Sequence, residues 1–375
     1  MTIRKILATL LALSMTLSLA ACGGNSTQTG TTQSEQTEQT EEAPTESDES
    51  PSDESAAENT ETETPADETE ASEPAEKVDI NLAALSGPTA LGMLDLLEKN
   101  ENGEAANNYN VTIATAPDEV TGKIISGELD IAAVPTNVAS TLYNKTEGQV
   151  QIAALNTMGV LYVLETGDTI QSVADLAGKT IYATGQGSTP EYALNLVLEK
   201  NGLTPGEDVE IVFAADNAEI APLLASGEAQ VALLPQPFVT SVLTQNENVR
   251  VALDLTEEWD KAVNGESGLT MGCVVVRKEF AEQNKEALDR FLDEYKQSVE
   301  TVTSEEGLAH AAELAEHYNI IKAAVAEKAI PECNIVFVEG DEMQQIAGGF
   351  LQVLYDANPQ AVGGQLPNDD FYYKR

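Results

Sequence analysis

Two short segments that combine glycine with hydroxyl and amide side chains occur one hundred residues apart. They read Ser86-Gly87-Pro88-Thr89 and Gln186-Gly187-Ser188-Thr189. A second matched pair, residues 135–137 and 235–238, adds proline, amide groups and one aromatic ring. None of the four segments contains Lys or Arg, whereas an anion with several charges usually requires an Arg fork. Their chemistry therefore favours hydrogen bonding and apolar packing with a neutral or singly charged organic molecule.

The candidate ligand-binding residues belong to these four segments, with one further ring just beyond the second segment. They are Ser86, Gly87, Pro88, Thr89, Thr136, Asn137, Gln186, Gly187, Ser188, Thr189, Tyr192, Gln236 and Phe238. The alternative is that Gly, Pro, Ser and Thr at these positions only form turns and cap helices. Trp259, the only Trp of the chain, is another candidate ring platform, and a packing role is the alternative for it.

The sequence shows no pattern of catalytic or metal-binding residues. No Ser/His/Asp, Cys/His or paired-carboxylate spacing indicates catalysis, and no Cys or His spacing indicates a metal site. The two histidines, His310 and His317, lie seven residues apart in a helical stretch rich in Ala, Glu and Leu. Cys273 and Cys333 could pair outside the cell or remain separate small residues of the core. We therefore expect no catalytic residue, no metal and no cofactor.

The four segments belong to an internal repeat with a period of about one hundred residues. Residues 118–140 and 218–240 share most apolar positions and six identities. Glu119, Ser126, Gly127, Glu128, Ala132 and Pro135 recur as Glu219, Ser226, Gly227, Glu228, Ala232 and Pro235. A period this long predicts a duplicated lobe rather than a solenoid.

Each copy is expected to alternate strands and helices. The expected strands are residues 80–85, 111–116 and 131–134 in the first copy and 180–184, 209–214 and 231–234 in the second. Helices are expected over 90–99 and 191–200, and a second pair after the N-caps Asp118 and Asp216, ending at Gly127 and Gly227. This order predicts right-handed βαβ units and a mostly parallel sheet in each lobe. Ligands of such sheets bind at the carboxyl ends of the strands, where all four segments lie.

The remaining segments complete an α/β fold of two lobes. Apolar strands at 159–164 and 272–277 flank the second copy and are expected to be the two crossovers, which act as hinges. Leu288, Phe291, Leu292, Tyr295 and Val299 form one helical face, and further helices are expected near 305–318, 323–329 and 343–356. We predict a first lobe made of residues 78–158 and 278–375, with a helical second segment, and an inserted second lobe of residues 159–277.

The N-terminus has the features of a secretory signal. Arg4 and Lys5 precede an apolar run, residues 6–21, that is too short to span a bilayer. Leu19-Ala20-Ala21-Cys22-Gly23 resembles the bacterial lipobox. The resemblance implies a signal peptide of residues 1–21 and a lipid on Cys22, which would anchor the protein to the cell membrane. The alternative is an ordinary cleaved signal with an incidental Cys.

Residues 22–77 are expected to be a disordered acidic tether. Between residues 23 and 77 there are 17 acidic residues, one basic residue, and no aromatic or branched aliphatic residue. Such a segment cannot bury enough apolar area to offset its chain entropy; an acidic interaction tail is the alternative. The formal net charge of the chain is −44, which disfavours nucleic acid as a partner.

The whole pattern resembles the type II periplasmic binding proteins of ABC importers. Within that family it is similar to the nitrate, sulfonate and taurine binding proteins and to those for thiamine pyrimidine precursors. Residues 170–179, I-Q-S-V-A-D-L-A-G-K, resemble the family's motif at the start of the second lobe, although Ala177 replaces the usual Lys. Residues 126–132 resemble its "G-x-x-D" segment, and Gln230 stands where the second copy would have Asp. The resemblance implies a monomeric, extracytoplasmic protein that binds a small solute and delivers it to an ABC transporter permease.

Two other classes of function remain as alternatives. A ligand-sensing or adhesive surface lipoprotein would share the lobes without an importer, and gene neighbours would distinguish it. Some proteins of similar fold are enzymes of menaquinone or thiamine-precursor biosynthesis, but this sequence lacks the catalytic spacings and has an export signal.

Overall fold

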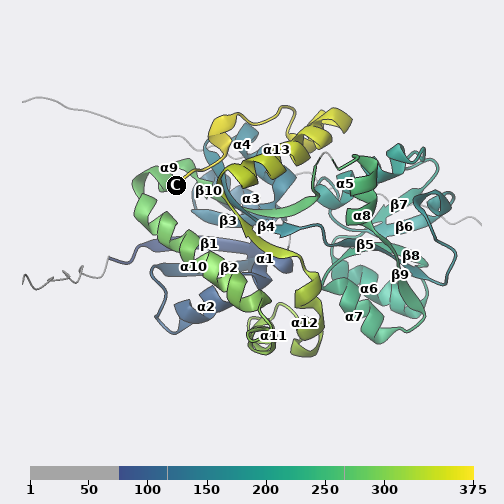
Figure 1. Cartoon of the computed structure of the whole chain (residues 1–375), viewed down its shortest axis with the longest axis horizontal. Coiled ribbons are helices and arrows are strands. Elements are labelled where there is room, and N and C mark those ends of the chain that lie inside the picture. The colour runs from purple at the N-terminus through teal and green to yellow at the C-terminus, as the bar shows by residue number, and fades with distance from the viewer. Residues whose placement is uncertain (1–75, 116, 266) are drawn as a thin grey trace, which may run out of the picture. The chain divides into compact units, whose positions relative to one another are not determined.

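The computed structural model describes residues 76–115, 117–265 and 267–375 (Figure 1). The predicted signal peptide, the predicted lipidation site Cys22 and nearly all of the predicted tether lie outside the described residues. The described part contains two sheets flanked by helices, as the repeat predicted.

Sheet A has six strands in the order β11-β4-β10-β3-β1-β2. Their bounds are β1 Asp79–Leu85, β2 Asn108–Ala114, β3 Ile131–Pro135, β4 Val150–Met158, β10 Thr270–Arg277 and β11 Ile335–Val338. The strands predicted at 80–85, 111–116 and 131–134 are β1, β2 and β3. β1 lies parallel to both β2 and β3, which is the pairing that βαβ units produce.

Sheet B has five strands in the order β7-β6-β8-β5-β9. Their bounds are β5 Leu161–Thr166, β6 Thr180–Ala183, β7 Glu210–Phe213, β8 Val231–Pro235 and β9 Val249–Asp254. β6 lies parallel to β7 and β8 in the same arrangement as β1, β2 and β3. The duplication seen in the sequence is therefore a duplication of this three-strand parallel unit.

Both sheets are mixed: most of their strands run in one direction, as predicted, and each sheet also contains antiparallel pairs. β10 runs antiparallel to β3 and β4, and β5 runs antiparallel to β8 and β9. β5 and β10 are the strands that follow the two crossovers. Each is reached from the other sheet and not through the helix of a βαβ unit, so neither needs to run parallel to its neighbours. Among the named strands, parallel pairing occurs within the repeated units.

The chain passes between the sheets twice. It leaves sheet A after Met158 and enters sheet B at Leu161, and after β9 and α8 it is again part of sheet A at β10. The second boundary expected at residue 277 is therefore too late, because β10 lies between β3 and β4 in the middle of sheet A. We call sheet A with its helices lobe 1 and sheet B with its helices lobe 2.

Thirteen α-helices are found among the described residues. They are α1 Pro88–Leu91, α2 Leu94–Glu101, α3 Pro117–Ser126, α4 Thr136–Lys145, α5 Thr189–Lys200, α6 Asn217–Ser226, α7 Phe238–Gln245, α8 Leu255–Ala262, α9 Lys278–Gln283, α10 Lys285–Thr303, α11 Leu308–His317, α12 Ala323–Ala329 and α13 Gly340–Ala357. Asp216 caps α6 through the N–H of Ala218, and Gly227 ends it in the left-handed region, as predicted. Asp118 lies inside the first turn of α3 instead, because Pro117 begins that helix.

The helix predicted over residues 90–99 is divided into α1 and α2 at Gly92 and Met93. Ser298 of α10 causes the break: its hydroxyl donates to the carbonyl of Gly92 at 2.8 Å and accepts from the N–H of Leu96 at 3.2 Å. A Cβ on Gly92 would lie 3.0 Å from Ile335 Cγ2, so glycine also allows α1 to approach β11 closely. The break thus depends on segments about 200 residues away.

The C-terminal segment packs onto sheet A. The predicted face of α10 is buried, with Leu288, Phe291, Leu292 and Tyr295 at 0 % exposure. β11 pairs with β4, and the N–H of Tyr373 donates to Ile152 O at 2.9 Å. Figure 1 shows α10, α13 and the C-terminus gathered around the strands of sheet A, away from the strands of sheet B.

Candidate ligand-binding site

A cavity of about 650 Å³ lies between the two sheets, at the carboxyl ends of their parallel strands. All six parallel strands contribute. The wall of lobe 1 includes Leu85 and Ser86 after β1, Thr115 after β2 and Pro135 at the end of β3. The wall of lobe 2 includes residues 184–188 after β6, 213–217 after β7 and Pro235 at the end of β8. The volume is within the range of small-molecule sites, about 300–1,000 Å³.

Backbone conformation explains glycine in the two matched turns. Gly87 has φ +132° and Gly187 has φ +74°, which side-chain-bearing residues rarely adopt. A Cβ at either position would have no atom within 4 Å. Glycine is therefore required by the positive φ angle and not by a lack of space. Gly187 lines the cavity, whereas Gly87 is buried beside it.

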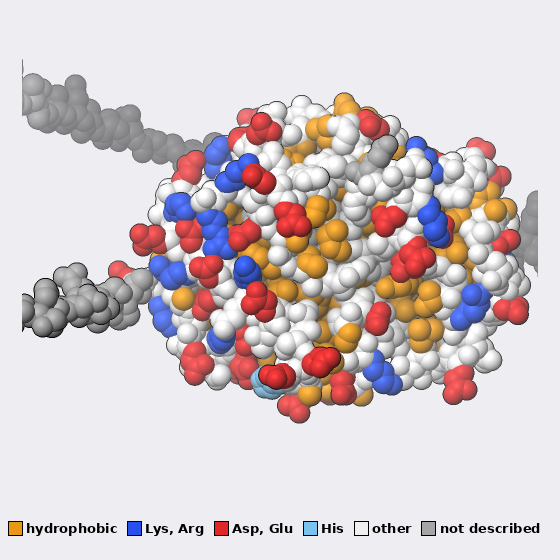
Figure 2. Space-filling model, viewed as in Figure 1, with side chains coloured by type: hydrophobic (Ala, Val, Ile, Leu, Met, Phe, Trp, Pro, Cys, Tyr) orange, Lys and Arg blue, Asp and Glu red, His pale blue; other side chains and the backbone are white. Residues whose placement is uncertain are grey.

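The wall combines apolar patches with few charges. Phe213, Met271 and Leu85 supply apolar surface. Asp118 and Asp216 are the acidic residues of the wall, and Lys145 is the only cation among the described lining residues. Figure 2 shows Asp and Glu side chains spread over the visible face rather than gathered at one place. The strong negative charge of the chain is therefore not concentrated in the cavity.

Lys145 and Val138 are lining residues that the sequence reasoning missed. They lie on α4 with Thr141 and Leu142, which also line the cavity. The spacing 138, 141, 142 and 145 is that of one helical face. This periodicity, continued from the predicted segment 135–137, is the signal that would have identified them.

The structure brings only some of the predicted residues to the cavity. Ser86, Gln186, Gly187 and Ser188 line it. Thr89 instead donates to Leu85 O at 2.6 Å within its own turn. Pro88 begins α1, and neither it nor Thr89 is among the lining residues.

Thr136, Asn137 and Thr189 are buried below the surface of the cavity. The hydroxyl of Thr136 lies 3.1 Å from that of Thr270 on β10. Thr189 Oγ1 donates to Asn137 Oδ1 at 3.1 Å, which joins α5 to α4. All three side chains therefore have polar partners within the protein.

Gln236 and the predicted rings also contact protein groups. Gln236 Oε1 accepts from the N–H and the hydroxyl of Thr240, at 3.2 and 2.9 Å, in the first turn of α7. Phe238 and Tyr192 are half-buried, and each packs against a hydrophobic cluster of the core. Burial raises the pKa of the Tyr192 hydroxyl.

Trp259 does not provide a ring platform in this cavity. It is fully buried, its Nε1 donates to Ser267 O at 2.9 Å, and its ring centroid lies 5.6 Å from that of Phe350 on α13. Its role is packing, the alternative considered above.

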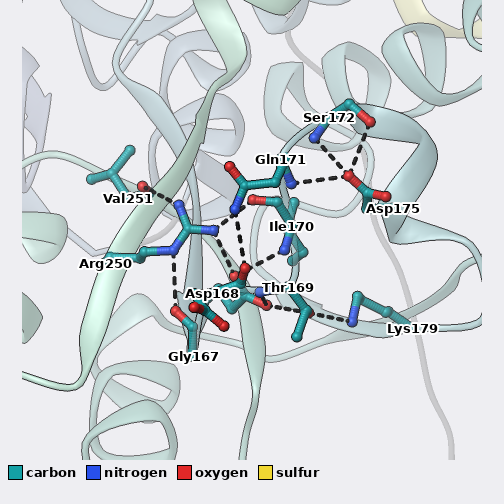
Figure 3. Close-up of polar contacts among 11 residues, drawn as sticks. Gly167, Asp168, Thr169, Ile170, Gln171, Ser172, Asp175, Lys179, Arg250 and Val251 are labelled. Carbon is teal, nitrogen blue, oxygen red and sulfur yellow. Dashed lines mark hydrogen bonds and ion pairs between the residues drawn. The ribbon is translucent and has the colours of Figure 1, made fainter.

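The motif at residues 170–179 builds a turn of lobe 2 (Figure 3). Asp175 Oδ2 accepts from the N–H groups of Gln171 and Ser172, both at 2.9 Å, in a capping box. Lys179 Nζ donates to Thr169 Oγ1 at 2.9 Å. These contacts close the turn that leads from β5 into β6.

Glu165 anchors this turn from inside the sheet. It is 2 % exposed and forms an ion pair with Arg250 Nη2 at 2.9 Å. Burial raises the pKa of its carboxyl, but hydrogen bonds from Thr169 and Ile170 and the Arg250 charge outweigh burial and lower the pKa overall. Glu165 pairs with Val231, the first residue of β8, whereas the cavity lies at Pro235, the last. The motif therefore lies at the end of sheet B opposite the cavity.

The described residues contain no group of three or more His, Cys, Asp and Glu that could hold a metal. Cys273 and Cys333 are both free thiols buried in the core. Of the two alternatives for them, the structure supports separate small residues of the core and not a disulfide. Burial raises the pKa of both thiols. No helix in the described ranges is long and apolar enough to cross a bilayer.

Several solved structures share this arrangement of sheets. An ABC transporter protein from Parabacteroides distasonis is 25 % identical with a TM-score of 0.66, over 79 % of this chain and 99 % of that chain. The periplasmic aliphatic sulphonate binding protein of Escherichia coli is 15 % identical with a TM-score of 0.63, over 79 % and 92 %. The alkanesulfonate-binding protein of Xanthomonas axonopodis pv. citri, bound to MOPS, is 17 % identical with a TM-score of 0.59, over 78 % and 96 %.

A family model for "ABC transporter, phosphonate, periplasmic substrate-binding protein" matches residues 95–327, more than half of the chain. No curated protein matches the chain by sequence. The match includes most of lobe 1, all of lobe 2 and most of the lining residues, although it begins after Ser86. The chain thus has the type II periplasmic binding protein fold and belongs to the family of periplasmic substrate-binding proteins of ABC transporters.

Proposed function

We propose that this protein captures a small organic solute between its two lobes and delivers it to the permease of an ABC importer. The observation that carries the proposal is the cavity at the carboxyl ends of six parallel strands, three from each sheet. The crevice at these strand ends is where α/β sheets bind ligands. In the part of the chain that the structure describes, the strands change sheet twice, so the lobes can close on a solute by bending at these two places.

The chemistry of the wall indicates the class of solute. Two acidic residues and one Lys give it a formal charge of about −1, so a dianion would meet about twice the net repulsion that a monoanion meets. Phe213, Met271 and Leu85 suit an apolar body, and Ser86, Gln186 and Ser188 suit a small polar head. The solute is a small organic molecule with no charge or a single charge. An aliphatic sulphonate, the ligand named for the similar E. coli protein, meets this description.

The N-terminal sequence supports attachment to the membrane. The lipobox-like residues before Cys22 suit lipidation, and an acidic tether of about 55 residues would hold the folded part away from an anionic bilayer. The protein acts as an extracytoplasmic, lipid-anchored monomer. Residues 76–375 are the solute-binding part of this arrangement.

Native mass spectrometry of the purified full chain tests the proposal. We expect a co-purified small molecule at one per chain, released by denaturation. Ethanesulfonate, methylphosphonate and a neutral amide serve as added probes in thermal unfolding, and a ligand at a hundredfold excess over its Kd should stabilise the protein by about 2.7 kcal/mol. Absence of any bound mass, together with no stabilisation across a broad solute panel, would contradict solute capture.

A further inference from the structure

Asn137 connects three segments that are far apart in the sequence. It is the second residue of α4 in lobe 1 and is 1 % exposed. Its Oδ1 accepts from Thr189 Oγ1 at 3.1 Å, where α5 begins in lobe 2. Its Nδ2 donates to Ala361 O at 3.1 Å and, over a longer 3.4 Å, to Gly187 O. The side chain therefore links α4 of lobe 1 to the C-terminal segment and to lobe 2.

The partners fix the orientation of this amide. The carbonyl oxygens of Ala361 and Gly187 can only accept hydrogen bonds, so the NH₂ group must face them. The oxygen then faces Thr189, whose hydroxyl must donate. Both N–H bonds of Asn137 are thus used within the protein, and neither is left for a ligand.

The position of this contact relates it to the cavity. Gly187 and Ser188 line the cavity and immediately precede Thr189, which is itself fully buried. Ser140 of α4 donates to Val362 O at 2.9 Å and so fixes the same helix to the C-terminal segment. Asn137 is therefore on a helix that is fixed within lobe 1, whereas Thr189 directly follows the cavity wall of lobe 2.

We propose that Asn137 and Thr189 form an interlobe latch, a pair of positioning residues that holds residues 187–188 of lobe 2 against lobe 1. The pair acts through the protein and does not touch the solute. Its effect on affinity rests on the proposed solute capture, since a pre-formed wall needs less ordering when a ligand binds. The latch itself operates in the ligand-free protein, where it favours the arrangement with the lobes close together.

The interlobe distance in the ligand-free full chain tests the latch. Spin labels on Glu119→Cys in α3 and Glu219→Cys in α6, introduced together with Cys22→Ser, report on the two walls, because both positions are exposed while the two other thiols, Cys273 and Cys333, are buried. Thr189→Val removes the donor with little change in volume. We expect the ratio of long to short distances to rise roughly 2- to 10-fold, as the loss of one buried hydrogen bond implies.

Two matched variants separate the latch from a general structural effect. Thr189→Ser keeps the hydroxyl and should restore the parental distances. Thr244→Val removes a hydroxyl that bonds only to Thr240 O within α7, and it should leave the distances unchanged. Asn137→Ala should widen the distribution at least as much as Thr189→Val, and if it fails to fold, Thr189→Val alone decides.

Unchanged distances in folded Thr189→Val protein would overturn the latch. That result would leave the proposed function intact if native mass spectrometry still finds solute bound to the same variant. Conversely, widened distances in a protein that never binds a solute would support the latch and contradict the proposed function.

Discussion

Gly159, in the first crossover, offers a direct test of how tightly the two crossovers pack. An ideal Cβ at this position would lie 2.1 Å from Oγ1, 2.7 Å from Cγ2 and 2.9 Å from Cβ of Thr256, in the first turn of α8. Its φ lies outside the range that demands glycine, so space is the only obstacle to a side chain. Asn334 Nδ2 also donates to Gly159 O at 2.7 Å, which limits movement of the backbone.

The contact geometry gives the expected magnitude. Gly159→Ala places a methyl group well inside van der Waals distance of Thr256, and overpacking of this kind costs about 1–3 kcal/mol. Thr256→Gly removes all three clashing atoms and should itself cost about 1 kcal/mol or less, near a helix end. In the double variant the methyl group has room, so the two costs should not add. We expect a coupling energy of about 1–3 kcal/mol.

Urea unfolding of the full chain measures this coupling through a double-mutant cycle, with Thr256→Ala as an intermediate case. Thr256→Ala leaves the Cβ at 2.9 Å, so it should relieve only part of the strain. Additive effects of Gly159→Ala and Thr256→Gly would refute the reasoning, because they would show that the crossovers do not press against each other.

Three further predictions concern other parts of the chain. The folded-state pKa of Glu165 is lowered, so its carboxylate contributes stability above the usual pKa of about 4.5, and this contribution is lost as pH falls through the lower folded value. Glu165→Gln should therefore make the melting temperature depend less on pH in that acidic range. A pH profile identical to that of the parent protein would contradict this. Cys22→Ala should release the protein to the medium or leave it unprocessed, as membrane fractionation would show; fully processed protein on the membrane would remove the lipid-anchor proposal. Gly187→Val, which forces a β-branched residue to φ +74°, should abolish ligand-induced stabilisation in thermal unfolding while lowering ligand-free stability only modestly; unchanged stabilisation would place the site elsewhere.

The sequence predicted those parts of the fold that local patterns determine. The repeated strands were found because each contains three or more apolar residues in a short segment between turn-forming residues. Asp216 and Gly227 were correctly predicted as the caps of α6 because capping is a property of a few neighbouring residues. The buried face of α10 followed from its helical period.

Features set by distant partners were not predicted. The sequence does not show that β10 enters between β3 and β4, since that pairing joins residues more than one hundred positions apart. The break between α1 and α2 depends on Ser298, and the burial of Trp259 depends on Phe350. The segments around Gly87 and Gly187 were located by the repeat, but which side chains face the cavity depends on contacts such as that between Asn137 and Thr189.

The place of β10 has a consequence for the order of folding. Lobe 2 is built from one continuous stretch, so its sheet can form as soon as residues 161–254 are available. Sheet A requires a strand from residues 270–277 between two strands that precede residue 159. Pairing across such a separation has a large loop-closure cost and is slow. We therefore expect lobe 2 to acquire protection from hydrogen exchange before β3 and β4. Residues 76–158 would remain incompletely paired until residues 270–277 are available.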